Sequence, residues 1–531
     1  MTQGLHRAAQ LKPHAVATIF GDRRRSWRQV CDRVARLAAL LVAQGLEPGD
    51  RVAVIALNSD RYIEIYYAVW WAGGVIVPGN MRWALAEHIF GLRDSGAELL
   101  LVDKAFAGLA ASLKDACPIR SVLFFDDGPA PAGTIEVEAL IASTSPMADT
   151  CSQDDALAAL FYTGGTTGRS KGVMLTHRSL TTSYLCGAAL MSRSEDQIFL
   201  HSAPMFHIGD AGRIIGTTIM GGTHVAVPFF SPENVCRVIE AERITDVLLI
   251  PTMFNMLREY ASDHRVDLSS VGLVAYGAAP ITETQLRQAM ELFPNAEFCQ
   301  GYGLTELSPN GTFLLPEFHK PSANGKSYLR SIGRVIVGSD LKIVDGEMNE
   351  RPRGGVGEIV VRGPGVMAGY WNQPELTRKA LVDGWLRTGD AAYMDDDGFV
   401  FLVDRMKDMI VSGGENIYSA EIENALSSHV DIVECAVIGI PHEKWGETVH
   451  AVVRLSAGAV SSADEIIAHC QAQIARYKCP RSVEFRTEPL PLSGAGKILK
   501  TELRKPYWVT ATHQATPFEP VVSRDSDGQI Q

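Results

Sequence analysis

The segment YTGGTTGRSKG at 162–172 combines glycines, threonines, a serine and a lysine. Small residues let backbone N–H groups approach phosphate oxygens closely, while the hydroxyls add donors and Lys171 adds a positive charge. Because the segment does not end in Gly-Lys-Ser/Thr, it does not match a P-loop NTPase. Two interpretations stay open for these residues alone, a phosphate-binding loop and a flexible Gly/Ser/Thr surface loop.

Two other motifs carry side chains suited to a nucleotide. In GYGLTE (301–306) the glycines allow a ligand close to the backbone, and Tyr302 offers a face for adenine stacking. Glu306 supplies the hard oxygen that Mg²⁺ prefers, although a turn followed by a helix start would look similar. Asp390 in RTGD is an acceptor-only carboxylate that suits two ribose hydroxyls, but an aspartate after glycine is also a common turn residue.

Lys497, in PLSGAGKILKTELR (491–504), has the clearest chemical rationale. Where two anions must approach each other in a reaction, a lysine that reaches both offsets their repulsion. A solvated surface position is the commonest alternative for a lysine. We expect the neighbouring Lys500 on the surface of the helix that follows.

His207 lies in SAPMFHIGDAG, after a strand-like region and before small residues. A lone histidine is more often a structural residue than a functional one. Asp210 and Arg213 stand three residues apart, so they either pair on one helix face or recognise a polar substrate tail.

Together these motifs resemble the signatures of the ANL superfamily of adenylate-forming enzymes, which includes acyl-CoA synthetases, firefly-type luciferases and adenylation domains. The segment DRMKDMIVSGGENIYSAEIE (404–423) resembles a further signature, and all occur in the family's order between residues 162 and 504. The resemblance is to the acyl-CoA synthetase (fatty-acid/aryl-CoA ligase) branch. It implies that a carboxylic acid and ATP give acyl-AMP and pyrophosphate, after which the CoA thiol gives acyl-CoA and AMP.

The resemblance also implies a role for each matching residue, with ATP, Mg²⁺ and CoA as the small molecules bound. The implied catalytic residues are Lys497, His207, Thr305 and Glu306, with Glu306 as the metal ligand. The implied ATP-binding residues are Thr163, Gly164, Gly165, Thr166, Thr167, Gly168, Lys171, Gly277, Ala278, Ala279, Gly301, Tyr302, Gly303, Thr305, Asp390, Arg405 and Lys497. The implied acyl pocket is His207, Ile208 and Gly303, the hinge is Lys407, and the CoA channel is Gly413, Gly414 and Trp445.

Alternating helix-like and strand-like segments must position these residues. Apolar residues at helical spacing, Val30 to Leu41, stop before a Pro-Gly-Asp turn, and the strand-like RVAVIAL at 51–57 follows. LLLVD at 99–103 and SVLFF at 121–125 are typical of strands buried on both faces. Such alternation predicts an α/β fold rich in parallel sheet.

The pattern changes near residue 339, where short strands alternate with Gly- and Asp-rich turns, as in antiparallel sheet. We therefore predict a large N-terminal adenylation domain over 1–404, in which parallel-rich α/β subdomains are joined by an antiparallel β subdomain at about 339–404. A small α+β C-terminal domain over 405–510, mobile by the resemblance, and a polar tail over 511–531 complete the prediction.

Composition limits the function classes. The 49 Lys plus Arg against 61 Asp plus Glu give a net charge of −12, which argues against a protein that grips nucleic-acid backbones. The nine cysteines form no CxxC pair, so a disulfide framework and a zinc site are both disfavoured. The longest apolar stretch is too short for a bilayer span, and we expect a cytoplasmic protein, with a homodimer as the commonest assembly.

The acid is predicted only by class. Apolar or small residues at 207–210, 252–257 and 301–309 favour a medium-chain, branched, alicyclic or aryl acid over acetate or a dicarboxylate. One rival is an acyl-AMP ligase that delivers to a carrier protein or another non-CoA acceptor. The other is a catalytically silent nucleotide-binding homologue, although the presence of Lys497, Glu306 and Asp390 argues against it.

Overall fold

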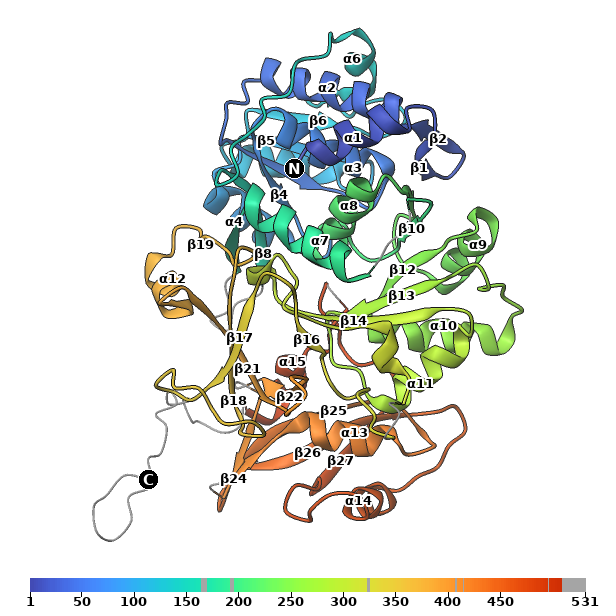
Figure 1. The fold of residues 1–531 in the computed structure, drawn as a ribbon, viewed down its shortest axis with the longest axis vertical. Helices are drawn as coiled ribbons and strands as arrows, with labels where there is room; N and C mark the ends of the chain where they lie inside the picture. Colours follow the sequence, from blue (N-terminus) through green and yellow to red (C-terminus); the bar gives the residue numbers. More distant parts are fainter. Residues whose placement is uncertain are drawn as a thin grey trace. The chain divides into compact units, whose positions relative to one another are not determined.

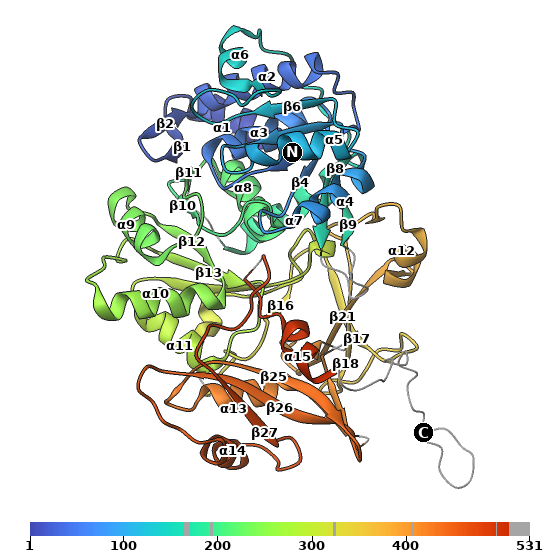
Figure 2. The same ribbon diagram turned by 180° about the vertical axis from the view of Figure 1, so that it is seen from behind.

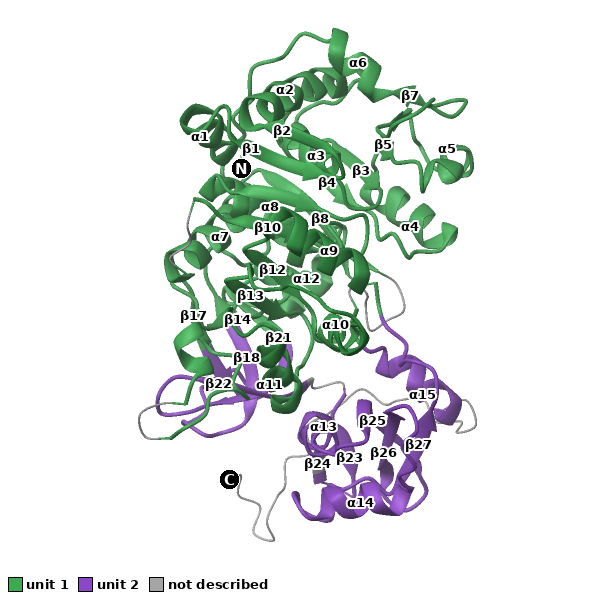
Figure 3. Cartoon of the chain, turned by 90° about the vertical axis from the view of Figure 1, so that its right-hand side faces the viewer, with its two compact units in different colours: residues 1–341, 361–388, 493–497 green, residues 342–360, 389–492, 498–531 purple. Residues whose placement is uncertain are grey.

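A computed structural model describes residues 1–163, 170–191, 195–321, 325–405, 408–413, 415–494 and 496–508. The chain forms two compact units, coloured in Figure 3. Unit 1 contains residues 1–341, 361–388 and 493–497, and unit 2 contains residues 342–360, 389–492 and 498–531. The predicted residues Gly164, Gly165, Thr166, Thr167, Gly168, Lys407, Gly414 and the tail 511–531 lie outside the described residues, as does the side chain of Arg405.

Unit 1 contains an eight-stranded sheet in the order β19-β9-β8-β4-β3-β5-β6-β7 (Figure 1). Its strands are β3 (Arg51–Ile55), β4 (Val75–Pro78), β5 (Leu99–Val102), β6 (Ser121–Phe124), β7 (Ile135–Glu136), β8 (Leu157–Thr163), β9 (Lys171–Thr176) and β19 (Gly369–Tyr370). The strands β4, β3, β5 and β6 pair in parallel, and every residue of β4 and β5 is buried. The expected parallel-rich α/β architecture is confirmed.

The second large sheet of unit 1 has nine strands in the order β16-β15-β14-β13-β12-β10-β11-β1-β2. They are β1 (Val16–Phe20), β2 (Arg23–Ser26), β10 (Ile198–His201), β11 (Thr223–Ala226), β12 (Asp246–Leu249), β13 (Leu273–Gly277), β14 (Glu297–Tyr302), β15 (Thr312–Leu314) and β16 (Arg334–Val335). Strands β11, β10, β12, β13 and β14 run in parallel. Their carboxyl ends therefore meet at one edge, where α/β proteins place ligands.

Helices cover both sheets, as Figure 2 shows from the opposite side. They are α1 (Gln3–Leu11), α2 (Trp27–Ala43), α3 (Asp60–Trp71), α4 (Leu85–Ser95), α5 (Ala110–Ala116), α6 (Val137–Ser143), α7 (His177–Met191), α8 (Ile208–Met220), α9 (Pro232–Glu242), α10 (Pro251–Asp263), α11 (Glu283–Leu292) and α12 (Pro374–Ala380), with 3₁₀ turns at η1 (Ala107–Leu109), η2 (Thr305–Leu307) and η3 (Pro316–His319). Helix α2 begins with a Ser26–Gln29 capping box and buries Val30 and Leu41, on the face that its sequence spacing predicts.

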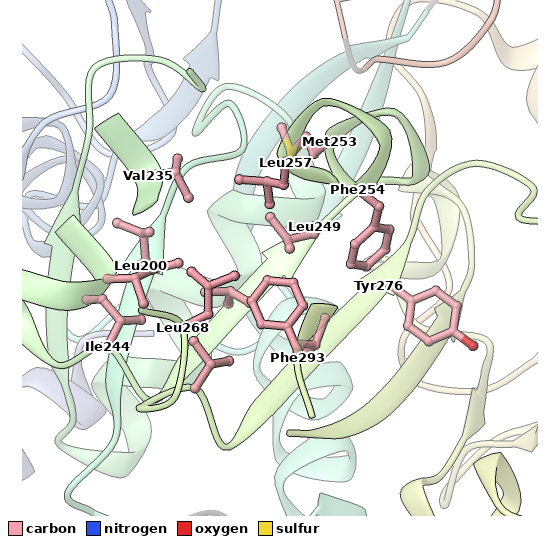
Figure 4. Close-up of a cluster of buried hydrophobic side chains, with 14 of the residues drawn as sticks. Leu200, Val235, Ile244, Leu249, Met253, Phe254, Leu257, Leu268, Tyr276 and Phe293 are labelled. Carbon is pink, nitrogen blue, oxygen red and sulfur yellow. The ribbon is translucent and has the colours of Figure 1, made fainter. Parts of the chain in front are cut away.

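The core of the nine-stranded sheet lies between its strands and helices α9, α10 and α11 (Figure 4). Leu249 of β12 and Tyr276 of β13 meet Phe254 and Leu257 of α10 and Phe293 after α11. These side chains are at most a few per cent exposed, so the strand ends that carry site residues rest on a closely packed base.

A five-stranded sheet follows in the order β17-β18-β21-β20, with β22 paired to β21. Its strands are β17 (Asp340–Val344), β18 (Gly357–Arg362), β20 (Leu381–Val382), β21 (Trp385–Met394) and β22 (Val400–Arg405). The pairs β20–β21 and β21–β22 are antiparallel, as the Gly- and Asp-rich turns predict.

The last part of unit 2 is a small α+β fold with the sheet order β24-β23-β26-β25 and β27 parallel to β26. Its elements are β23 (Ile410–Ser412), β24 (Glu415–Ile417), α13 (Ser419–Ser427), β25 (Ile432–His442), β26 (Gly446–Leu455), α14 (Ala463–Gln471), β27 (Ser482–Arg486) and α15 (Lys500–Trp508). Ile422 and Leu426 of α13 pack with Val437 and Val449 in its core.

Candidate active site

Lys171, Glu306 and Tyr370 form a polar cluster in unit 1. Lys171 begins β9, and β19 pairs with that strand so that Tyr370 stands opposite Val173. The Tyr370 hydroxyl donates to Glu306 Oε1 at 2.7 Å, and Lys171 Nζ lies 2.6 Å from that hydroxyl and 3.3 Å from Glu306 Oε1. Tyr370 was not identified from the sequence. The only signal for it was its register opposite β9, which is visible only after folding.

The cluster balances charge in a largely buried place. Glu306 is 9% exposed, and the Lys171 ammonium also lies 4.0 Å from the centre of the Tyr370 ring. Burial and the adjacent Glu306 carboxylate raise the pKa of Tyr370, so its hydroxyl keeps its proton and remains a donor. The backbone N–H of Met367 donates to the Glu306 carbonyl at 2.9 Å and fixes the η2 turn.

Glu306 is the candidate metal ligand. Among the described residues, no group of three or more His, Cys, Asp or Glu side chains could hold a metal ion. A single carboxylate is still consistent with Mg²⁺, since that ion is often held by one or two carboxylates together with substrate phosphates. Glu306 therefore fits a metal that arrives with ATP.

The adenine-side segment is shaped by close backbone contact. Gly277 stands opposite Gly301 in the β13–β14 pair, and a Cβ on Gly277 would lie 2.1 Å from the Gly301 carbonyl oxygen. Ala278 has φ +65°, which turns the chain sharply after the strand. A Cβ on Gly303 would lie 1.6 Å from the Pro309 carbonyl oxygen. Packing therefore requires glycine at 277 and 303, whatever ligand these positions meet.

His207 caps the first turn of α8. Its Nδ1 accepts the backbone N–H of Gly209 at 3.2 Å, and Ile208 behind it is buried. Burial, with a smaller effect from the nearby Lys497 ammonium, lowers the pKa of His207 to about 3. The imidazole is therefore neutral at any working pH.

Lys497 belongs to a tight turn, residues 493–497, that is part of unit 1. The Ser493 N–H donates to the Lys497 carbonyl at 2.7 Å, and the Lys497 N–H donates to Ser493 Oγ at 3.1 Å. Gly496 has φ +73° and is buried against Ile250, while Thr252 Oγ1 donates to its carbonyl at 3.4 Å. Lys497 and His207 thus belong to the same compact unit, although they are far apart in the sequence.

The hydrogen-bond partner of Asp210 is neither Arg213 nor a position open to a substrate tail, the two interpretations that the sequence left open. Asp210 is 1% exposed and bonds His201, whose Nε2 lies 3.0 Å from Nδ1 of His224. His224 Nε2 in turn lies 3.0 Å from Thr218 Oγ1. This buried chain ties α8 to β10 and β11, so Asp210 has a structural partner in the sheet below the helix.

In unit 2, Asp390 of β21 stands opposite Arg405 of β22 in the strand register. Asp390 is 1% exposed, and Gly389 before it has φ +71° with its N–H donating to Glu358 at 2.9 Å. The predicted partners of a ribose therefore lie on neighbouring strands at matching positions.

Trp445, predicted for the CoA channel, packs against two side chains of unit 2. The His442 ring stacks on it at 4.2 Å, and the Arg481 guanidinium lies 3.7 Å from its ring centre. The Gly413 N–H donates to the Trp445 carbonyl at 2.9 Å. The prediction for Lys500 was wrong, because it is partly buried and pairs with Glu423 at 2.7 Å.

Two family models match this chain. The model described as AMP-binding enzyme matches residues 5–371, and the model described as AMP-binding enzyme C-terminal domain matches residues 421–497. The chain belongs to the AMP-binding enzyme family. The ANL resemblance drawn from the motifs is therefore confirmed.

Curated relatives include the feruloyl-CoA synthase of an Amycolatopsis species, 38% identical over 500 residues that cover 94% of this chain and 97% of that protein. The fatty acid–[acyl-carrier-protein] ligase ScoC of Streptomyces coeruleorubidus is 36% identical, covering 94% of this chain and 95% of that protein. The crystal structure of ATP-bound MatB from Rhodopseudomonas palustris matches with a TM-score of 0.86 and 29% identity, covering 95% of this chain and 98% of that one.

This AMP-binding enzyme is an AMP-forming acid–thiol ligase of the acyl-CoA synthetase family. Its family substrates are ATP and a carboxylic acid. Within the part of the chain that the structure describes, no helix is long and apolar enough to cross a membrane.

Proposed function

We propose that the protein is an acyl-CoA synthetase that activates a medium-chain, branched, alicyclic or aryl carboxylic acid and transfers the acyl group to CoA. The observation that carries the proposal is the packing of the Lys497 turn on unit 1, where Thr252 Oγ1 donates to the Gly496 carbonyl, within the unit that also holds Lys171 and Glu306. Similarity to a feruloyl-CoA synthase over nearly the whole chain supports CoA as the acceptor.

In the first half-reaction, the carboxylate of the acid attacks the α-phosphate of ATP and pyrophosphate leaves. Lys497 offsets the charge that gathers between the two anions, and Thr305 donates to the α-phosphate. Glu306 would hold a Mg²⁺ ion, which supplies charge neutralisation on the phosphates when bound. Lys171 and the loop from Thr163 to Gly168 bind the phosphate groups, and Tyr370 keeps the Glu306 carboxylate oriented.

The acid and the nucleoside are held by other residues. His207, neutral because of its burial, borders the acyl pocket with Ile208 and Gly303 and orients the carboxylate without adding charge. Gly277, Ala278, Ala279, Gly301 and Tyr302 form the adenine side, and Asp390 with Arg405 binds the ribose. A neutral gate suits an apolar or aryl acid better than a second carboxylate.

In the second half-reaction, the CoA thiolate attacks the acyl carbonyl and AMP leaves. Gly413, Gly414 and Trp445 line the channel for the thiol arm, and Lys407 is the hinge that lets Lys497 withdraw. The Trp445 ring, fixed by His442 and Arg481, gives the channel a rigid wall.

A thioester-forming screen tests this proposal. Purified protein with ATP, Mg²⁺ and a panel of aliphatic, branched, alicyclic and aryl acids is assayed for AMP release with and without CoA. We expect CoA-dependent AMP release and an acyl-CoA product by mass spectrometry for an acid of the stated class. Acyl-AMP that accumulates without thioester, for every acid in the panel, would overturn CoA as the acceptor.

A carrier protein is the second candidate acceptor, favoured by the 36% identity to a fatty acid–[acyl-carrier-protein] ligase. The same screen, repeated with a phosphopantetheinylated carrier protein, separates the two. Faster acylation of the carrier than of CoA would favour this alternative.

A further inference from the structure

The backbone carbonyl of Ser493 accepts a hydrogen bond from a side chain that lies outside its own turn, that of Arg82. It accepts the Gly496 N–H at 2.9 Å within the turn and Nη1 of Arg82 at 3.2 Å from the body of unit 1. Ser493 also forms hydrogen bonds with both the N–H and the carbonyl of Lys497. The residue that Arg82 contacts is therefore joined directly to the backbone of the lysine.

A second contact locks the same turn. A Cβ on Gly494 would lie 2.7 Å from the Asn80 side-chain nitrogen and 2.8 Å from its oxygen, so the Asn80 amide lies directly against Gly494. Asn80 cannot easily give way, because its Oδ1 accepts the backbone N–H of Arg82 at 3.0 Å. Asn80 and Arg82 therefore form one small rigid surface on which residues 493–497 rest.

This surface is next to the end of β8. Asn80 follows β4, and β4 runs parallel to β8, so the carboxyl ends of both strands face the same way. Thr163 ends β8, and Tyr162 just before it meets Trp83 edge-on at 6.2 Å between ring centres. One segment, residues 80–83, thus touches both the lysine-bearing turn and the end of β8.

We infer that Asn80 and Arg82 are positioning residues that hold Lys497 in place for the adenylation half-reaction. They act through Lys497 and do not touch the reacting atoms. This inference rests on the proposed role of Lys497 in that step. The contact serves only while residues 493–497 rest on unit 1, so loss of Arg82 slows acyl-AMP formation and leaves transfer from acyl-AMP to CoA unchanged.

The test measures the two half-reactions separately in Arg82→Ala. Adenylation is followed as acid-dependent ATP–pyrophosphate exchange, and transfer as CoA consumption from chemically supplied acyl-AMP. Loss of a charged hydrogen bond to a carbonyl predicts a fall of about fivefold to tenfold in the adenylation rate, with an unchanged KM for ATP. Arg82→Lys restores part of that rate.

Gly494→Ala is a second variant, since its Cβ would press on Asn80 and lift the turn while the Arg82 side chain is retained. We expect the same selective loss, and the double variant loses less than the product of the two. Arg93→Ala is the matched control, because Arg93 is also an arginine that donates to a backbone carbonyl, that of Ala116 at 2.8 Å, away from this turn. It leaves both rates unchanged.

Several outcomes would overturn the inference. A raised KM for ATP in Arg82→Ala would make Arg82 a phosphate contact instead, and equal loss in both half-reactions would make it merely structural. Unchanged adenylation in Arg82→Ala, when Lys497→Ala abolishes it, would refute the positioning role alone. If Lys497→Ala itself leaves adenylation unchanged, the proposed function of Lys497 fails first.

Discussion

At the residue scale, the orientation of the Glu306 carboxylate depends on the hydroxyl group of Tyr370. Tyr370→Phe removes the hydroxyl that donates to Glu306 but keeps the ring beneath Lys171. We expect adenylation to slow by about tenfold, the effect of roughly 1.4 kcal/mol from one lost charged hydrogen bond. The half-saturating Mg²⁺ concentration should rise, because the carboxylate is less well oriented.

Tyr507→Phe is the matched control for Tyr370→Phe. Tyr507 donates to Glu484 at 2.6 Å, a tyrosine–carboxylate bond of the same kind in unit 2. Both variants are assayed by ATP–pyrophosphate exchange across a Mg²⁺ titration. Equal behaviour of the two variants would contradict a special role for Tyr370.

His207 should not titrate in the working range. Its pKa is lowered to about 3 by burial and by Lys497, so the proton is absent from pH 5 upward. We predict that His207→Ala raises KM for the acid but leaves the shape of the adenylation pH profile between pH 5 and 8 unchanged. A wild-type inflection near pH 6.5 that disappears in His207→Ala would refute this.

At the element scale, the β13–β14 pair sets the shape of the adenine side. Gly277→Ala would place a Cβ 2.1 Å from the Gly301 carbonyl oxygen, so the strands must separate, at a cost of about 3 kcal/mol. Gly21→Ala, at φ +57° with nothing within 4 Å, carries only backbone strain of about 1 kcal/mol. Thermal unfolding followed by circular dichroism should show the larger loss in Gly277→Ala, and equal shifts would contradict the steric argument.

Elements with local signals were predictable from sequence, and contacts across long separations were not. The α2 cap and the Thr282–Gln285 cap of α11 lie within a few residues of their helices, so their types alone identify them. Tyr370 stands 64 residues from Glu306 and 199 from Lys171, and no spacing rule links them.

The candidate site divides in the same way. The sequence singles out Lys497, Glu306 and His207 as candidates because each lies in a contiguous motif. Lys500 was misplaced because its partner, Glu423, comes from a distant helix, α13. Arg82 was missed for the same reason, since its contact is with Ser493.

At the scale of the whole molecule, buried neutral histidines make stability depend on pH. Burial lowers the pKa of His177 and of His319 to about 4. The unfolded chain, with a histidine pKa near 6.5, binds more protons between pH 6.5 and 4, so stability falls as the pH falls through that window. Each histidine contributes at most about 1.4 kcal/mol per pH unit.

His177→Gln should therefore lose less stability than the wild type between pH 6.5 and 4.5. The measurement is the thermal unfolding midpoint at several pH values, with the exposed His14→Gln as control. If the unfolding midpoint depends on pH in the same way in His177→Gln and the wild type, the His177 side chain is not neutral in the folded protein.

The net charge of −12 is compatible with polyanionic substrates, because nearby lysines and not the overall charge attract the phosphate groups. Lys171 and Lys497, both in unit 1, bring positive charge to the candidate site. The overall charge still argues against a nucleic-acid partner, whose binding would need a basic surface.

In the proposed function, Lys497 drives acyl-AMP formation by this acid–thiol ligase. Its most direct test is acid-dependent ATP–pyrophosphate exchange in Lys497→Ala, with ATP binding followed separately by calorimetry. We predict that exchange falls by at least 100-fold while ATP still binds, since the lost charge is needed chiefly in the transition state. Exchange at the wild-type rate with ATP bound would refute the catalytic role of Lys497.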